Sequence, residues 1–197
     1  MLRLRPYQFL GVLGLAFMLT GCGLTSSYSF KTGAISPPRE APPLPLIDQD
    51  GNPFDLSQLN GKVVLVYFGY TACPDACPTT LSDWIEIKRL LGDQADRVAF
   101  VMVTVDPERD SAATLNQYLD FFDPSFIGLT GEPETIQKVE QDYGILAVRE
   151  DFGDSAMGYL MNHTTSYWAI DPDGALRLVI SHGSDPEIVA EDLRHLI

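Results

Sequence analysis

The sequence predicts an α/β protein built on a mixed sheet with helices on both faces. Two runs of β-branched and aromatic residues, 62–68 and 97–105, have the nearly continuous apolar character of strands buried on both faces. Segments with helical spacing of apolar residues alternate with such runs, which is the order of a sheet flanked by helices. Of the 197 residues, 45% are hydrophobic and 20% are charged, as is typical of a globular protein.

The first elements of the domain are a hairpin, a strand and a helix. Residues 46–48 and 53–56 are joined through Asp50-Gly51-Asn52, a turn signal that indicates a small hairpin. The buried strand at 62–68 follows it. Residues 78–91 then place apolar side chains at roughly helical spacing, and Pro78 suits the first turn of a helix, where a backbone N–H is not needed.

The alternation continues through the rest of the chain. We expect a strand over 97–105, a helix over 111–122, a strand over 126–129, a helix over 132–143 and a short strand over 145–148. Asp171-Pro172-Asp173-Gly174 is a strong turn signal between residues 164–170 and 175–180, which we interpret as an antiparallel hairpin. A final helix begins near Asp185 and runs to the end of the chain.

The first residues have the features of an export signal. Basic residues precede an apolar run at 9–19, which is shorter than the ~20 residues that a membrane-spanning helix needs. The next residues, Leu19-Thr20-Gly21-Cys22, are similar to the bacterial lipobox, in which the cysteine is lipidated. We therefore predict a signal peptide over 1–21 and a lipid anchor on Cys22, on the periplasmic side of a bacterial membrane. An ordinary signal peptide with an incidental Cys22 is the alternative.

A tether is expected between this anchor and the domain. Residues 22–45 are rich in Ser, Thr and Pro, and include Pro37-Pro38 and Pro42-Pro43. Because each proline fixes its backbone φ angle, the second half of this segment should be stiff and extended. Residues 46–197 are then expected to form a single domain.

The charge of the chain limits its partners. It has 13 Lys and Arg against 27 Asp and Glu, for a formal net charge of −14 at pH 7. Such an acidic surface argues against nucleic acid, whose phosphates need Lys and Arg. It favours cationic partners or metal cations. The 3 cysteines are too few for a disulfide scaffold.

Two of these cysteines, Cys73 and Cys77, are the candidates for metal binding or thiol–disulfide chemistry. They lie in the loop between the strand at 62–68 and the next helix, where ligands of α/β sheets bind. Residues four apart on a helical turn are neighbours, so both sulfurs can bind one soft metal ion or close to a disulfide. Cys77 is expected at the helix N-terminus, which favours its thiolate. A purely structural disulfide would close too short a loop to stabilise the fold much.

A metal would need a third ligand, and the residues alone leave that ligand open. His163, His182 and His195 are the candidates. Met157 and Met161 are soft enough for Cu(I), but we assign them to packing.

The motifs resemble those of the Sco (SCO1/SenC) family of copper proteins. The matching residues are Thr71-x-Cys73-Pro74-Asp75-x-Cys77-Pro78-Thr79-Thr80-Leu81, Thr104-Val105-Asp106-Pro107-Glu108-Arg109-Asp110, and His163-Thr164 ahead of Asp171-Pro172-Asp173-Gly174. The resemblance implies a thioredoxin-like fold and copper, as Cu(I) or Cu(II), bound by Cys73, Cys77 and His163. It also implies delivery of that copper to the Cu(A) site of cytochrome c oxidase, with subunit II or another cuproprotein as partner.

The chain departs from the family pattern at one position. The residue before the ligand histidine is commonly acidic in the family, and here it is Asn162. The sequence therefore offers no supporting carboxylate at that position. Asp106 and Arg109 are expected either to support the cysteine loop or to form a capping ion pair at the next helix.

Two other functions remain open at this point. In the first, Cys73 and Cys77 are the redox-active pair of a thiol–disulfide oxidoreductase that reduces the cysteines of the Cu(A) site. Thioredoxin-like reductases usually have Cys-x-x-Cys, however, and this chain has one more intervening residue. In the second, the chain is a thiol peroxidase of the peroxiredoxin type, but its Thr71-Ala72-Cys73 lacks the Thr-x-x-Cys spacing of that class.

Overall fold

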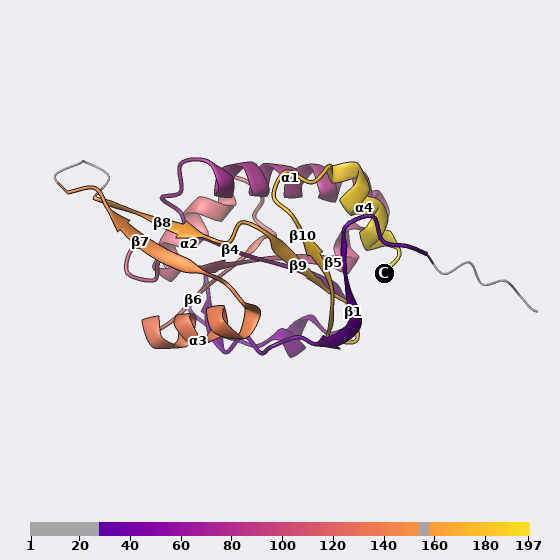
Figure 1. Cartoon of the computed structure of the whole chain (residues 1–197), viewed down its shortest axis with the longest axis horizontal. Coiled ribbons are helices and arrows are strands. Elements are labelled where there is room, and N and C mark those ends of the chain that lie inside the picture. Colours follow the sequence, from indigo (N-terminus) through magenta and orange to yellow (C-terminus); the bar gives the residue numbers. More distant parts are fainter. Residues whose placement is uncertain (1–27, 154–157) are drawn as a thin grey trace, which may run out of the picture.

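The computed structural model describes residues 28–153 and 158–197 and places them around one mixed sheet (Figure 1). This 8-stranded sheet has the order β1-β10-β9-β4-β5-β6-β2-β3, and β7 and β8 form a separate two-stranded sheet. The strands are β1 (Gly33–Glu40), β2 (Leu46–Asp48), β3 (Pro53–Phe54), β4 (Val63–Gly69), β5 (Val98–Thr104), β6 (Ile127–Thr130), β7 (Ala147–Asp151), β8 (Tyr159–His163), β9 (Tyr167–Ile170) and β10 (Ala175–Ile180). The helices are α1 (Ala76–Leu91), α2 (Ala112–Asp120), α3 (Pro133–Tyr143) and α4 (Pro186–Arg194), with short 3-10 helices η1 (Leu56–Leu59) and η2 (Gly92–Arg97).

The centre of the sheet confirms the predicted α/β class. β4 and β5 run parallel and are buried along their whole length, while β9 pairs with β4 antiparallel. Adjacent residues of β4 point to opposite faces. Tyr67 meets Trp84 of α1, with ring centroids 6.2 Å apart, and Phe68 meets Tyr143 of α3 at 5.3 Å. Helices therefore cover both faces, α1 and α4 on one and α3 on the other (Figure 1).

The helices begin where the sequence predicts, for local reasons. The Ser111 side chain accepts a hydrogen bond from the backbone N–H of Thr114 and so caps α2. Pro133 and Pro186 occupy the first turns of α3 and α4. α1 begins at Ala76, slightly earlier than expected, so Cys77 lies in its first turn. The predicted strands and hairpins are also present, with bounds that differ by a few residues.

The structure corrects the assignment of residues 33–40 to a free tether. These residues form β1, which pairs antiparallel with β10 at one edge of the sheet. Pro37 and Pro38 are compatible with a strand at this position because an edge strand has one side free of ladder hydrogen bonds. The register shifts between Ala34 and Arg39, around these prolines. The folded part of the chain therefore begins well before Leu46.

β8 is the second strand that the sequence analysis missed. It pairs antiparallel with β7, and the two strands form a hairpin that projects from one end of the molecule (Figure 1). α4 and the start of β1 lie at the opposite end. Residues 1–27, with the predicted signal peptide and Cys22, lie outside the described residues, as does Met157. Among the described helices, none has the length and apolar character needed to span a bilayer.

Candidate metal centre

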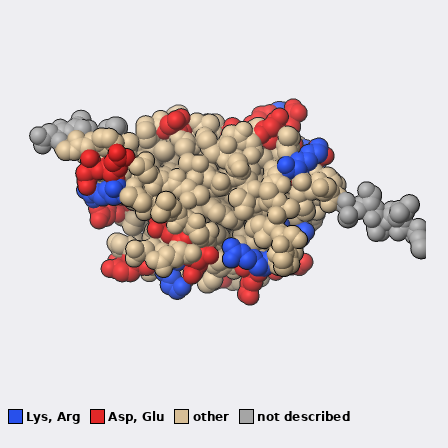
Figure 2. Space-filling view, viewed as in Figure 1, with Lys and Arg blue, Asp and Glu red and all other residues tan. Residues whose placement is uncertain are grey.

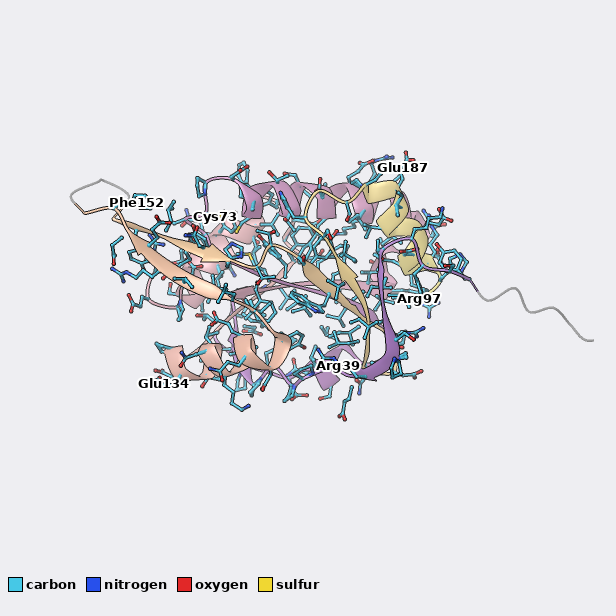
Figure 3. The ribbon with its side chains drawn as sticks, viewed as in Figure 1. Arg39, Cys73, Arg97, Glu134, Phe152 and Glu187 are labelled. Carbon is cyan, nitrogen blue, oxygen red and sulfur yellow. The ribbon has the colours of Figure 1, made fainter. Side chains whose placement is uncertain are left out.

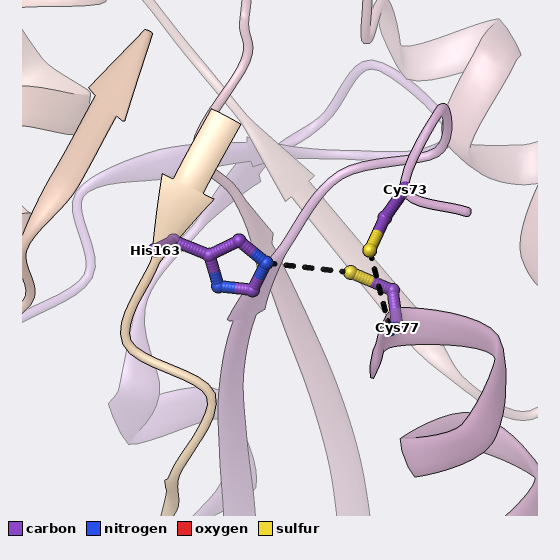
Figure 4. A group of neighbouring side chains, drawn as sticks. All are labelled: Cys73, Cys77 and His163. Carbon is purple, nitrogen blue, oxygen red and sulfur yellow. Dashed lines mark hydrogen bonds between the residues drawn. The ribbon is translucent and has the colours of Figure 1, made fainter. Parts of the chain in front are cut away.

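Three side chains from three different elements converge beside the first turn of α1 (Figure 4). Cys73 lies in the loop after β4, Cys77 lies in the first turn of α1, and His163 is the last residue of β8. Their ligand atoms all lie within 4.8 Å of one another, and both cysteines are free thiols. The Cys77 Sγ and His163 Nε2 atoms are 3.6 Å apart. This spacing suits one first-row metal ion, whose bonds to N and S are ~2.0–2.3 Å long.

His163 is oriented for binding before any ion arrives. Its Nδ1 lies 2.9 Å from the carbonyl oxygen of Thr164, which can only accept a hydrogen bond. Nδ1 therefore carries the proton, and the lone pair of Nε2 faces the two sulfurs. The rings of Tyr67 and Tyr70 stand roughly edge-on to the imidazole, with centroids 6.0 and 5.7 Å from it. The imidazole is thus held on two sides.

The Asn162 departure has a structural explanation. Asn162 is exposed, and its side-chain amide donates a 2.6 Å hydrogen bond to Glu150 across the hairpin. Alternation along β8 points it to the face opposite His163. The orienting acceptor for the imidazole is the Thr164 carbonyl instead of a carboxylate at position 162.

The two thiols differ in acid–base character, and not in the way that the sequence predicts. Cys77 is 0% exposed, and burial raises its pKa even though the Tyr67 hydroxyl donates to its sulfur at 3.3 Å. Cys73 is partly exposed and accepts the backbone N–H of Cys77 at 3.4 Å. A hydrogen bond from the Cys77 thiol, the largest cause, and hydrogen bonds from the backbone N–H groups of Asp75 and Cys77 lower the pKa of Cys73 to about 3. The expectation of a thiolate at Cys77 is therefore wrong, because the unpaired N–H of the helix terminus points at Cys73.

Gly69 makes room for the buried thiol. A Cβ atom at this position would lie 2.9 Å from the Cys77 sulfur and 2.7 Å from the Tyr67 ring. Any larger residue at the end of β4 would push the sulfur or the ring from its place.

Asp110 holds the cysteine loop. Its carboxylate is 0% exposed and accepts hydrogen bonds from the backbone N–H of Thr71 at 3.0 Å and from the Thr71 hydroxyl at 2.6 Å. The Thr104 hydroxyl, at the end of β5, donates a third at 2.7 Å. The loop is thus tied to the neighbouring strand. The sequence alone did not predict this role, although Asp110 belongs to the motif over residues 104–110.

Asp106 and Arg109 act mainly on the hairpin. They form an ion pair, and the Tyr159 hydroxyl donates to Asp106 at 2.8 Å. The Arg109 guanidinium donates to the Tyr159 carbonyl at 3.1 Å and stacks 3.6 Å from the centroid of its ring. The Tyr70 ring, 5.6 Å from the guanidinium, is the side chain through which Arg109 reaches the cysteine loop. The expected support of that loop is thus largely support of the strand that carries His163.

The other candidate ligands do not reach the site. His182 Nδ1 lies 3.1 Å from the Thr80 hydroxyl, and His195 stacks on Tyr28 with centroids 3.5 Å apart. Met161 packs against the core. Within the described residues, the cluster of Cys73, Cys77 and His163 is the one group of His, Cys, Asp and Glu with metal-ligand spacing.

Known proteins are similar to this chain in sequence and in fold. The family model described as SCO1/SenC matches residues 33–197, so the match begins with β1. A SCO2-like protein of Rickettsia felis is 36% identical over 149 residues, which are 76% of this chain and 73% of that protein. The structure of Bradyrhizobium japonicum ScoI with copper bound is similar with a TM-score of 0.74 and 38% identity, covering 81% of this chain and 100% of that one. A SCO1/SenC family lipoprotein from Bacillus anthracis has a TM-score of 0.70 and 26% identity, covering 83% of this chain and 99% of that one.

The fold and the site together define a thioredoxin-like protein with a centre of two thiols and one imidazole. The family match extends from the first strand of the sheet to the end of the chain. The chain belongs to the SCO1/SenC family.

Proposed function

We propose that the chain is a membrane-tethered, extracytoplasmic copper chaperone that delivers copper to the Cu(A) site of cytochrome c oxidase. The observation that carries this proposal is the convergence of Cys73, Cys77 and His163 within 4.8 Å of one another. Solved family members with copper bound, such as the Bradyrhizobium japonicum protein, support the choice of metal.

The ligand set favours copper over zinc. Two thiolates and an imidazole are soft to borderline donors, which suit Cu(I), and Cu(II) accepts them with one further ligand. Zn²⁺ accepts the same donors but usually needs four of them in a closed tetrahedron. Copper also ranks above zinc in the divalent affinity order.

Delivery would proceed by ligand exchange. Cys73 is partly exposed, whereas Cys77 is buried beneath it, so an incoming ligand from a partner reaches the ion on the Cys73 side. A three-ligand site leaves a coordination position for that ligand. Copper can then pass to the partner without being released into water, since each new bond forms before an old one breaks.

The test is copper binding by the purified protein. We expect close to one copper per chain, with sulfur-to-Cu(II) charge-transfer bands that change in His163→Ala and disappear in Cys73→Ala and Cys77→Ala. His182→Ala is the matched control, because that imidazole lies at the same end of α1 but outside the cluster. Unchanged copper retention in all three ligand variants would contradict the proposal.

A second candidate, thiol–disulfide oxidoreductase, is favoured by the unequal thiols. The Cys73 thiolate would attack a disulfide of the oxidase subunit and release one of its thiolates. Cys77 would then displace the second, leaving the substrate as a dithiol and the chain with a Cys73–Cys77 disulfide. This reaction needs both cysteines and no copper. If the His163→Ala variant still reduces a Cu(A)-site disulfide, the oxidoreductase activity is assigned to this chain. If that variant no longer reduces the disulfide, the result counts against the oxidoreductase activity.

The membrane tether rests on the lipobox-like residues before Cys22 and on the family lipoprotein of Bacillus anthracis. Several acyl chains on one residue would give stable anchoring, because each buried CH₂ contributes ~0.8 kcal/mol. Cells that express the full chain and are grown with radioactive palmitate should label it. Cys22→Ala should abolish the label, and a chain that is unlabelled but secreted would favour the ordinary signal peptide.

A further inference from the structure

A groove separate from the copper ligands lies beside the hairpin. It has a volume of about 350 Å³ and is formed by α3, the β7–β8 hairpin and the loop after β5. Neither cysteine nor His163 lines it. Its apolar part includes Val105, Ile136 and Met161, and the described structure leaves it open to solvent beside the projecting strands.

The polar lining of the groove is acidic. Four carboxylates and one guanidinium line it, namely Asp106, Glu108, Glu134, Glu140 and Arg149. Asp106 is paired with Arg109, and Glu108 with Arg149 at 3.3 Å. Within the described part of the chain, the carboxylates of Glu134 and Glu140 form no salt bridge. Figure 2 shows that acidic side chains gather over the hairpin and α3 at this end of the molecule.

Glu140 is the group that most needs a cation. It is partly buried on α3, and this burial raises its pKa to about 7, although the nearby His163 acts to lower it. Loss of water from a carboxylate is unfavourable unless a cation or a donor replaces that water. A cation that entered the groove would therefore replace the water that the Glu140 carboxylate loses on burial, and would stabilise its charged form.

A basic side chain fits the groove better than a bare metal ion does. The methylene stem of arginine or lysine packs on apolar surface while its charged end pairs with carboxylates, as the lining here allows. Arginine in addition binds carboxylates with two parallel hydrogen bonds. A metal ion would gain nothing from the apolar surface of Val105, Ile136 and Met161.

The groove is close to the copper ligands. Met161 lines it, and His163 follows two residues later on the same face of β8. We propose that this groove receives an arginine or lysine side chain of the protein that exchanges copper with this chain, and so positions that protein's ligands beside His163 and Cys73. The inference rests on the proposed chaperone function. Charge pairs of this kind mainly accelerate and orient association.

The first test measures binding and does not involve copper. The probe is acetyl-leucyl-arginyl-leucine amide, titrated to millimolar concentration into the isotope-labelled protein and followed by NMR. We expect shift changes at amides that line the groove. They should be lost in Glu134→Gln/Glu140→Gln and retained in Asp93→Asn/Asp96→Asn, which removes the same charge from exposed residues of η2, next to Arg97 at the other end of the molecule (Figure 3). Shift changes elsewhere, or equal changes with citrulline in place of arginine or with Mg²⁺ alone, would overturn the inference.

The second test measures copper transfer to the soluble Cu(A) domain of an oxidase subunit II. Glu134→Gln/Glu140→Gln should bind copper like the wild type but transfer it about tenfold more slowly at low salt, with the difference shrinking at high salt. Asp93→Asn/Asp96→Asn should transfer normally. Equal copper-transfer rates in both double variants would overturn the proposed role of the groove in partner binding. The chaperone function would still stand. Absence of transfer by the wild type would instead count against the chaperone function, while the peptide titration still decides the groove.

Discussion

At the residue scale, the decisive feature is the inequality of two thiols four positions apart. Cys77 is enclosed by β4 and Tyr67, and its charged form is disfavoured by burial. Cys73 lies just outside the helix and receives the backbone N–H that the first turn cannot satisfy internally. In the proposed function, this pair would offer an accessible sulfur to the partner and a sheltered sulfur that keeps hold of the ion.

This inequality predicts selective alkylation. Because the pKa of Cys73 is lowered to about 3, its thiolate fraction is complete from pH 5 to 8, and its rate with iodoacetamide should be flat over that range. An ordinary thiol, with a pKa of ~8.5, would react about tenfold faster for each unit of pH. Mass spectrometry of the metal-free protein should show Cys73 modified and Cys77 protected. A rate at Cys73 that climbs steeply with pH would contradict this.

Gly69 gives a second prediction at this scale. Gly69→Ala places a methyl group against the Cys77 sulfur and the Tyr67 ring, so we expect the free energy of unfolding to fall by about 1–3 kcal/mol and copper binding to weaken. Gly128→Ala is the matched control, since its Cβ would lie 2.8 Å from a Leu119 methyl group, away from the sulfurs. Urea unfolding should show a loss in both variants, and copper titration a loss only in Gly69→Ala. Normal copper binding by Gly69→Ala would show that the sulfur tolerates the shift.

At the element scale, the hairpin brings its histidine to the sulfurs. β8 is tied to the loop after β5 through Tyr159, and the backbone N–H of Met161 donates to the Tyr70 hydroxyl at 3.3 Å. Arg149 covers the outer side of the same Tyr159 ring, 3.7 Å from its centroid, while Arg109 lies 3.6 Å from it. His163 is therefore fixed at one end of a strand whose other end is clamped.

Loosening the clamp should weaken copper binding without touching a ligand. Arg109→Lys keeps the positive charge but loses the guanidinium bond to the Tyr159 carbonyl and the flat stacking surface. We expect about tenfold weaker copper binding and faster amide hydrogen exchange in β7 and β8, because one hydrogen bond to a charged group contributes ~1.5–3 kcal/mol. The alkylation rate of Cys73 should be unchanged. Arg89→Lys is the control, since its ion pair with Glu86 on α1 is exposed and worth little. Equal effects of both variants would argue against a specific clamp.

The elements also show what the sequence could and could not predict. β4 and β5 were predictable because strands buried on both faces are apolar throughout, and α2 was predictable from Ser111 as its cap. β1 was missed because its prolines favour a tether, and only its place at the sheet edge makes them acceptable. β8 was missed because its side chains are only partly buried and its main support, the Arg109–Tyr159 contact, joins residues 50 positions apart. The cysteine pair was readable from spacing, whereas His163 was selected by resemblance alone.

At the scale of the whole molecule, the metal centre and residues 28–32, which lead into β1, lie at opposite ends. The hairpin with His163 projects from one end, and α4 with the start of β1 forms the other (Figure 1). At that second end Asp192, 0% exposed, accepts hydrogen bonds from the Tyr28 hydroxyl, the Thr32 hydroxyl and the backbone N–H groups of Lys31 and Thr32. One carboxylate thus fastens the segment that leads into the sheet.

Removing the charge of the Asp192 carboxylate should release residues 28–32 from α4. Burial acts to raise the pKa of Asp192, but the hydrogen bonds from Tyr28, Lys31 and Thr32 outweigh it and lower the pKa below its usual 3.8. A lowered pKa means that the carboxylate stabilises the folded state above that value, and that this stabilisation is lost as the pH falls through the folded-state pKa. Asp192→Asn should therefore lower the free energy of unfolding by about 1–3 kcal/mol at pH 7, with the difference from wild type vanishing in strong acid.

The measurement is urea unfolding of wild type and Asp192→Asn across a pH series, together with limited proteolysis before β1 and copper titration. Cleavage near residues 28–32 should accelerate, while copper binding stays normal because the metal centre lies at the other end. Glu191→Gln is the neighbouring control, since its bridge to Lys31 at 2.5 Å joins two exposed side chains and should contribute little. Equal losses of unfolding free energy in both variants would mean that the negative charge of α4 as a whole, and not the buried Asp192 carboxylate, holds residues 28–32. A loss of copper binding in Asp192→Asn alone would mean instead that residues 28–32 are coupled to the hairpin through the sheet.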